Sequence, residues 1–171
     1  EKASGLPLHT LVRDKILDPL ALKDTYTQIK EDLPDGFVNG YEDMDGDGEA
    51  EDVSDLNDGA GLGDGALISN AADLTTFYRA LLQDQTLLSP AAMKELLAFQ
   101  PDDAGDGYSL ALASWETPYG EALGHSGAVS GFQSIGIYLP QHETIIIALS
   151  GSADFDPEAL ALAAAETILG Q

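Results

Sequence analysis

The sequence has no cysteine, few cationic residues and no long apolar run. Without Cys the 171-residue chain has no disulfide, no thiolate metal site and no cysteine nucleophile. Its 7 Lys and Arg residues stand against 30 Asp and Glu, which gives a formal net charge of -23. Such a surface repels phosphate backbones and anionic lipid headgroups, so we expect no nucleic-acid partner and no membrane partner. No apolar stretch approaches the roughly 20 residues that a membrane-spanning helix needs.

The acidic excess leaves three interpretations open. Dispersed carboxylates that hold water and cations suit a halophilic protein in a saline habitat. Loading with calcium and ordinary surface acidity are the two alternatives. The 44% of apolar residues is typical of a folded globular chain, and the length is enough for one domain with its own core.

The first part of the chain is predicted to contain helices and loops. Apolar residues at helical spacing predict helices over 7–17, 66–83, 89–99 and 156–170. We expect either Ser69 or Asn70 to cap the second helix, with Asp73 completing a capping box. Ser89 is placed to cap the third helix, with Pro90 at its first helical position, and the fourth helix is predicted to start at Asp156 with Pro157 inside it.

The last third of the chain changes to the period of strands. Residues alternate over 108–115 and 132–140, and the β-branched apolar run 143–151 suits a strand that is buried on both faces. We therefore predict an α+β fold, with helices and loops over 1–100, then a three-stranded antiparallel meander and a covering C-terminal helix over 101–171.

One stretch, GHSGAVSGF over 124–132, resembles a hydrolase motif and raises the question of a nucleophile. A nucleophile elbow needs G-x-S-x-G on a turn between a strand and a helix. Here the fifth position is Ala128 and the following residues are strand-like, so Ser126 does not fit that motif. Two interpretations remain: a structural β-bulge, or a Gly-bearing strand that offers backbone N–H groups to the oxyanion of an acyl substrate.

Several segments in the same order resemble the C-terminal part of the serine β-lactamase-like family, which contains class C β-lactamases, D-alanyl-D-alanine carboxypeptidases and esterases. They are EKASGLPLHTLVRDKILDPLALKDTYT, GDGALISNAADLTTFYRALL, LLSPAAMKELL, YSLALAS and GHSGAVSGFQSIGIYLP. The resemblance implies the β-lactamase/transpeptidase-like fold and a serine hydrolase that needs no cofactor. It also favours a periplasmic or secreted location.

By this resemblance, the HSG tripeptide is the third motif of the family, on the strand that lines the catalytic cleft. His125 would stand where many relatives have Lys. Ser126 would contact the substrate, and Gly127 would leave room for it. The backbone N–H of Ala128 would be one oxyanion donor. The resemblance therefore places Ser126 in the wall of the cleft, with the nucleophile elsewhere.

The other two motifs of the family are missing from the sequence. No Lys has a Ser three residues before it, so S-x-x-K is absent, and no Tyr begins Tyr-x-Asn or Tyr-x-Ser. In the family both motifs precede the segment that EKASGLPL resembles. We therefore expect a single C-terminal fragment of a longer domain over 1–171, inactive alone, whose partner is the missing N-terminal half. A second copy, joined as a dimer or by a strand swap, is the alternative partner, because the run 143–151 would otherwise expose an unpaired apolar edge.

The acidic loop DMDGDGEAEDVSD resembles the start of a calcium loop. Asp43, Asp45, Asp47 and Glu49 offer oxygen ligands on alternate residues, and Gly48 suits the sharp turn. Position twelve is Ser54, so the bidentate Glu that closes such a loop is absent, and Asp52 or Asp55 could substitute for it. A calcium site and a simple solvated acidic loop both remain open at this point.

Two hypotheses about function follow. The first is a fragment of a serine hydrolase that acts on small ester, amide or lactam acyl substrates. Because no Lys or Arg lies near the third motif, this hypothesis favours an esterase or peptidase over an efficient β-lactamase. The second is a non-catalytic, acidic, calcium-binding interaction module.

Overall fold

The computed structural model describes residues 1–56, 63–65, 67–101 and 106–170. Part of the Gly- and Asp-rich stretch 31–65, which its lack of periodicity predicts to be a long loop, lies outside these described residues. The helical segments are α1 (Leu8–Val12), α2 (Ala71–Tyr78), α3 (Pro90–Leu96) and α4 (Pro157–Leu169), with π-helical turns over Arg13–Leu17 and Arg79–Gln83 and a 3-10 turn over Pro140–His142. The strands are β1 (Tyr26–Thr27), β2 (Tyr41–Glu42), β3 (Glu51–Asp52), β4 (Leu67–Ile68), β5 (Gln100–Pro101), β6 (Gly107–Tyr108), β7 (Ala113–Thr117), β8 (Gly120–Val129), β9 (Phe132–Leu139) and β10 (Thr144–Ser150).

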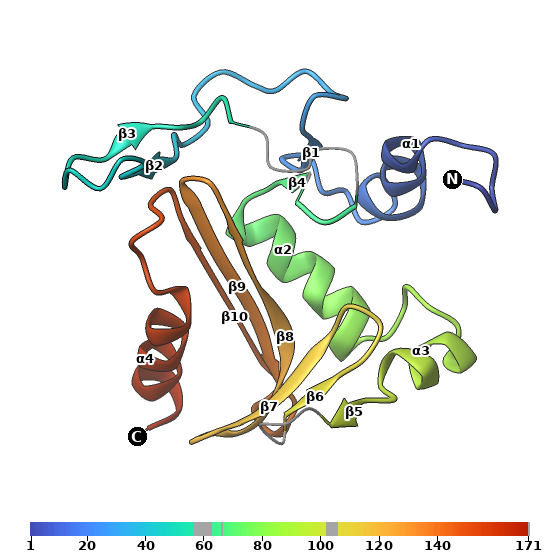
Figure 1. Cartoon of the computed structure of the whole chain (residues 1–171). Coiled ribbons are helices and arrows are strands. Elements are labelled where there is room, and N and C mark those ends of the chain that lie inside the picture. The colour runs from blue at the N-terminus through green and yellow to red at the C-terminus, as the bar shows by residue number, and fades with distance from the viewer. Residues whose placement is uncertain (57–62, 66, 102–105, 171) are drawn as a thin grey trace. The chain divides into compact units, whose positions relative to one another are not determined.

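The predicted α+β class, antiparallel meander and C-terminal helix are confirmed. The sheet is wider than the predicted three strands, with the order β10-β9-β8-β7-β6-β5 (Figure 1). The predicted strand over 108–115 is divided in two, because the backbone turns back between β6 and β7. Ser109 N–H donates to Leu112 O at 2.9 Å, and Ala111 takes the left-handed φ of 61° that this turn requires. Within the described residues, no helix is both long enough and apolar enough to cross a bilayer.

The helix predicted over 66–83 begins later, at Ala71, because Asn70 is its cap. Asp73 N–H donates to Asn70 Oδ1 at 2.8 Å. The predicted capping box between Asn70 and Asp73 is not formed, since Asp73 Oδ2 accepts instead from Asp24 N–H at 2.9 Å and from the Thr25 hydroxyl at 2.8 Å. The predicted cap Ser89 is confirmed, because its side chain accepts from Ala92 N–H. The helix predicted to start at Asp156 begins at Pro157, and Asp156 is its cap, since its side chain accepts from Ala159 N–H.

The chain forms two compact units, which we describe separately. The first comprises Glu1–Asp73, Gly127–Gln133 and Leu149–Phe155. In it, β1 pairs with β4 and β2 pairs with β3, both antiparallel. Tyr41 joins β2 to the segment after β10, because its N–H donates to Gly151 O and its carbonyl accepts from Ala153 N–H, each at 3.0 Å.

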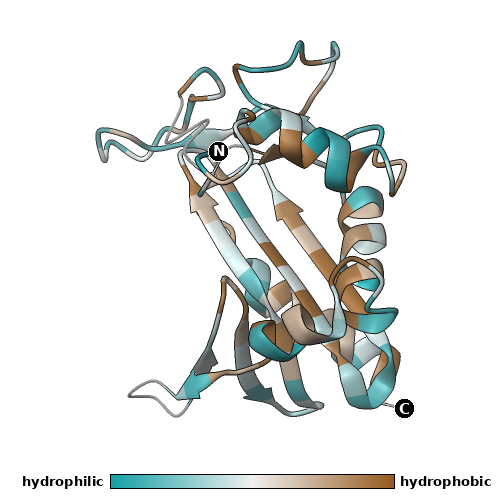
Figure 2. Cartoon of the chain, turned by 90° about the vertical axis from the view of Figure 1, so that its right-hand side faces the viewer, coloured by the Kyte–Doolittle hydropathy of each residue, from teal (hydrophilic) through white to brown (hydrophobic). Residues whose placement is uncertain are grey.

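The second unit comprises Leu74–Ser126, Ser134–Ala148 and Asp156–Gln171. The strands of this unit carry apolar residues on both faces of the sheet. In Figure 2 these hydrophobic residues are the brown segments that recur along the strands. One cluster joins the sheet to α4 and contains Ala122, Ile135, Ile137, Leu139, Ile146, Ala148, Ala161 and Ala165. The other joins the opposite face to α2 and α3 and contains Leu82, Met93, Leu96, Leu112, Leu123 and Tyr138. As predicted, the run 143–151 contributes to both faces, because Ile146 packs in the first cluster and Ile145 against the second.

Candidate functional site

Strand β8 carries the four predicted site residues at its exposed end. His125, Ser126, Gly127 and Ala128 follow one another on this strand and are all exposed. The pairing of β8 with β7 ends where Ala113 faces Gly124, so the four residues extend beyond β7. Ser126 therefore lies inside a strand and not on the strand-to-helix turn of a nucleophile elbow.

Tyr108 fixes the His125 side chain. Its hydroxyl lies 3.0 Å from Nε2 of the imidazole, and the two rings pack edge to face with centroids 5.7 Å apart. The other ring nitrogen, Nδ1, bonds to the carbonyl oxygen of Ser126. Because a carbonyl oxygen only accepts, Nδ1 donates this hydrogen bond, and Nε2 is left to bond with the Tyr108 hydroxyl, which can donate or accept. The imidazole is thus held at both nitrogens at the surface of the sheet.

Tyr108 is a site residue that the sequence alone does not indicate. It lies 17 positions before His125 in the chain, and only the pairing of three strands brings the two together. Tyr108 faces Ala113, and Ala113 faces Gly124, the residue before His125. The sequence does show a tyrosine at the start of the YSLALAS segment. It does not show that the chain turns back between β6 and β7, and this turn is what brings Tyr108 to His125.

An apolar cavity of about 280 Å³ lies beside His125. Apart from His125 and Tyr78, its lining consists of apolar side chains from α2, the following helical turn, the segment before α3, α3 itself and the β6–β7 turn. The lining residues are Phe77, Tyr78, Leu81, Leu82, Leu88, Leu96, Leu110, Ala111, Leu112 and His125. No Lys or Arg is among them, so the cavity itself offers no cationic partner for a carboxylate.

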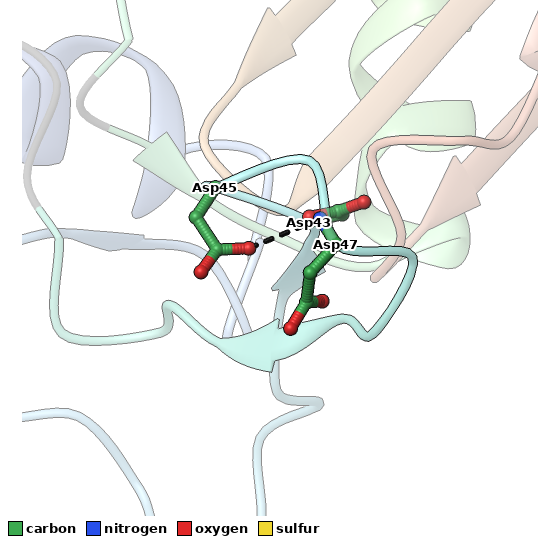
Figure 3. A group of neighbouring side chains, drawn as sticks. All are labelled: Asp43, Asp45 and Asp47. Atoms are coloured by element: carbon green, nitrogen blue, oxygen red, sulfur yellow. Dashed lines mark hydrogen bonds between the residues drawn. The ribbon is translucent and has the colours of Figure 1, made fainter.

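The acidic loop connects β2 to β3 and brings three of its four predicted ligands together. Oxygen atoms of Asp43, Asp45 and Asp47 lie within 4.8 Å of one another (Figure 3). Asp43 also accepts from the N–H groups of Gly46 and Gly48 at 2.7 and 2.8 Å, and Asp47 N–H donates to Asp45 at 3.1 Å. The loop therefore holds its carboxylates in place through its own backbone.

Glu49 is not part of this group of carboxylates. Its backbone N–H donates to Asp47 Oδ1 at 2.8 Å. Asp52, which sequence analysis left as a substitute for the missing closing Glu of a calcium loop, is bonded elsewhere: it accepts from Ser54 and from the Asn39 amide. Those bonds, of which the Ser54 hydroxyl is the strongest, hold the pKa of Asp52 below its ordinary value.

A comparison with protein families decides the affiliation of the chain. The family model described as Beta-lactamase matches residues 1–170. The chain belongs to the Beta-lactamase family. The fold is the β-lactamase/transpeptidase-like fold, which is a serine-hydrolase type of fold, and the predicted resemblance is confirmed.

Several solved structures match the chain over most of its length. A D-stereospecific amidohydrolase from Streptomyces sp. is 28% identical with a TM-score of 0.84, and the match covers 100% of this chain and 51% of that one. A D-amino acid amidase from Ochrobactrum anthropi SV3, complexed with L-phenylalanine amide, is 22% identical with a TM-score of 0.76 over 97% of this chain and 50% of that one. An octameric penicillin-binding protein homologue from Pyrococcus abyssi is 22% identical with a TM-score of 0.78 over 100% and 40%. The chain thus spans about half the length of the solved structures it matches, or less.

Proposed function

We propose that the chain is the C-terminal part of a serine hydrolase that cleaves ester, amide or lactam bonds of small acyl substrates. The observation that carries this proposal is His125, exposed on β8 beyond the end of β7 and held at both ring nitrogens, in a chain that matches the family over 1–170. In this proposal a Ser in an S-x-x-K motif, from a segment beyond this chain, attacks the acyl carbonyl, and water then releases the acyl group.

Each residue of the HSG stretch has a proposed role in that reaction. The His125 imidazole stands at the position that Lys occupies in many relatives and faces the reacting group. Ser126 contacts the substrate, Gly127 leaves room for the acyl chain, and the Ala128 N–H stabilises the oxyanion. Since the lining of the cavity beside His125 contains no Lys or Arg, we propose that the bound portion of the substrate is uncharged, as in an ester or amide.

We propose the missing half of the domain as the partner of the chain, and a second copy as the alternative. In the described part of the chain, β10 is the outer strand at one end of the six-stranded sheet. Apolar side chains follow this strand, with Ile145 and Ile147 half-buried. An outer strand of this kind is a template for another strand, which the absent half or a swapped copy would supply.

Hydrolysis of a chromogenic acetate ester tests the proposal directly. The product of the complete gene and the 171-residue chain are assayed side by side, together with D- and L-phenylalanine amides. We expect turnover by the longer product and none by the short chain. His125→Ala is expected to lower kcat/KM of the longer product by about 100-fold, the scale of a lost acid–base or electrostatic group.

His142→Ala is the matched control, because it removes an exposed imidazole from the turn before β10. Equal activity of both variants would contradict the role of His125. Turnover by the short chain that Ser126→Ala abolishes would instead make Ser126 the nucleophile.

The alternative function, a non-catalytic acidic module that binds calcium, is favoured by one observation: the gathered carboxylates of Asp43, Asp45 and Asp47. Calorimetric titration with Ca²⁺ tests it, with Asp45→Asn as the binding variant and the exposed Asp35→Asn as its control. Calcium binding that only Asp45→Asn weakens supports a site in the β2–β3 loop. If the unaltered chain and its variants release no heat of binding with Ca²⁺, the loop is a solvated acidic segment.

A further inference from the structure

The turn between β8 and β9 follows the candidate site directly in the chain. Ser130 and Gly131 form this turn, and Ala128, whose N–H is the proposed oxyanion donor, comes two residues before Ser130. Gly131 is buried and takes a left-handed φ of 74°, a conformation that favours glycine. Because so short a turn joins the two strands, its position limits where the end of β8 can lie.

The side chain of Glu42 binds this turn from a distant part of the sequence. The Gly131 N–H donates to Glu42 Oε2 at 2.9 Å, across 89 positions of the chain. A hydrogen bond from a backbone N–H to a carboxylate is roughly twice as strong as one between neutral groups. Both residues belong to the first compact unit, as do Gly127 and Ala128. The contact is therefore internal to one unit, and it connects β2 to the strand end that carries the proposed oxyanion donor.

Close packing around Gly131 accompanies the bond to Glu42. A Cβ on Gly131 would lie 2.5 Å from Cγ2 of Val53 and 2.7 Å from the carbonyl carbon of Gly40. A Cβ on Gly40 would in turn collide with the ring of Phe132, the first residue of β9. Glycine at both positions lets the segment before β2 approach the turn closely. The Glu42 carboxylate is thus part of a packed contact and not an isolated bond at the surface.

Strand β2 is bonded along both of its edges, so Glu42 extends from a fixed base. On one edge Tyr41 lies opposite Asp52 of β3. On the other edge Tyr41 makes hydrogen bonds of 3.0 Å with Gly151 and Ala153, which follow β10. Strand β2 cannot shift without breaking these bonds, and the turn that Glu42 holds is fixed with it.

The pairing of β2 with β3 does not by itself account for a glutamate at position 42. Glu42 lies directly opposite Glu51 in this pair. Like charges at opposite positions destabilise an antiparallel pair. The carboxylate of Glu51 accepts from Met44 N–H at 3.1 Å, within the same hairpin. Glu42, by contrast, makes its bond outside the hairpin, at the β8–β9 turn.

We propose that Glu42 is a positioning residue of the candidate site: its carboxylate holds the Gly131 N–H and so sets where the end of β8 places Gly127 and Ala128. The effect of this placement on hydrolysis rests on the proposed function. The placement itself is a property of the present chain.

Nuclear magnetic resonance of the 171-residue chain tests the placement without any assay of activity. In Glu42→Ala we expect the Gly131 N–H to exchange with solvent about 10-fold faster, the effect of one lost hydrogen bond. We also expect the amide resonance of Ala128 to move, because the end of β8 is released. Glu42→Gln keeps an oxygen that accepts, so it is expected to restore most of the protection and the position of the Ala128 resonance.

Glu51→Ala is the matched control, because it removes the same charged group from the opposite position of the hairpin. We expect it to leave both amide groups as they are in the unaltered chain. An Ala128 resonance that stays in place in Glu42→Ala would overturn the proposal, and so would equal changes in Glu42→Ala and Glu51→Ala. If Glu42→Ala does not fold, nuclear Overhauser contacts in the unaltered chain decide. Contacts from the Glu42 side chain to the Gly131 N–H support the proposal, and their absence overturns it.

Kinetics of the longer product test whether the placement matters for hydrolysis. We expect Glu42→Ala to lower kcat for the chromogenic acetate ester by about 10-fold with little change in KM, less than the 100-fold or more of a deleted oxyanion donor. Glu42→Gln is expected to recover most of this rate, and Glu51→Ala to retain it. An active longer product whose kcat is unchanged in Glu42→Ala would overturn the role of Glu42 in the site.

Failure of this proposal and failure of the proposed function are distinguishable. An inactive longer product beside a displaced Ala128 resonance would reject the hydrolase and keep Glu42 as the residue that places the end of β8. An active longer product beside an unmoved Ala128 resonance would keep the hydrolase and reject the role of Glu42.

Discussion

Gly124 packs closely against the backbone of the adjacent strand β9. A Cβ at this position would meet the Gly136 carbonyl oxygen, which belongs to the backbone of β9 and cannot turn away. We predict that Gly124→Ala lowers the free energy of unfolding by about 3 kcal/mol, the upper range for overpacking a core. Urea unfolding measures it, with the exposed Ser126→Ala on the same strand as control. A loss no larger than that of the control would show that β8 and β9 separate easily.

Glu31 gives the chain a defined dependence on pH. Arg13 donates to its Oε1 from Nε and Nη2 at 2.9 and 2.7 Å, and Thr27 N–H donates to Oε2 at 2.7 Å. Burial raises the pKa of Glu31, but the bonds from Thr27 and Arg13 together outweigh it, so the pKa lies below 4.5. A carboxyl group with a lowered folded-state pKa stabilises the fold above its unfolded value, and this contribution is lost as the pH falls through the folded value.

We therefore predict that Glu31→Gln costs about 1–2 kcal/mol at about pH 7 and that the difference decreases as the pH falls below 4.5 through the folded-state pKa. Chemical unfolding of both proteins over this range of pH measures it. Asp14→Asn, which neutralises an exposed carboxylate, controls for the change in net charge. A difference that stays constant with pH would mean that Glu31 acts through packing and not through its charge.

At the scale of elements, helix α4 depends on its first residues. Its cap is Asp156, whose Oδ1 accepts from Ala159 N–H at 3.0 Å, and Pro157 occupies the first helical position. Below this cap, Ala161 and Ala165 pack against the sheet. The cap therefore fixes where the covering helix begins and which of its faces meets the strands.

We predict that Asp156→Ala lowers the free energy of unfolding by about 1 kcal/mol, the usual value of an N-cap. Thermal unfolding followed by circular dichroism measures it. Asp154→Ala is the control, since it removes the same charge two residues earlier, outside the helix. Equal effects of the two substitutions would assign the loss to charge and not to capping.

At the scale of the whole molecule, the net charge of -23 predicts a dependence on salt. Repulsion among the carboxylates opposes the compact state. Added salt screens this repulsion, because the Debye length falls from about 10 Å at 0.1 M to about 3 Å at 1 M salt. We predict that Tm rises by several degrees over this range of NaCl, roughly the effect of 1–2 kcal/mol. Sucrose at equal osmolality is the control, and a rise of the same size in sucrose would contradict an electrostatic cause.

Local patterns predicted most elements because their causes are local. The caps at Ser89 and Asp156 follow from side chains beside their helices, and the apolar run 143–151 follows from burial on both faces of a strand. The start of α2 was predicted too early, because residues 67–68 pair with β1, which lies about forty residues earlier in the chain. The strand over 108–115 was predicted as continuous, because the turn between β6 and β7 depends on an Ala with a positive φ, which no composition signals.

The sequence by itself determined the α+β class, the family, the acidic surface and the HSG stretch on a strand, since these depend on composition, period and motif. Only the tertiary structure showed that Tyr108 bonds to His125 and that the Tyr78 hydroxyl donates to the Gly136 carbonyl of β9. It also showed that three Asp residues of the loop come together while Glu49 and Asp52 do not. These arrangements depend on strand register and on contacts between distant residues, and a one-residue change of register would redirect every side chain involved.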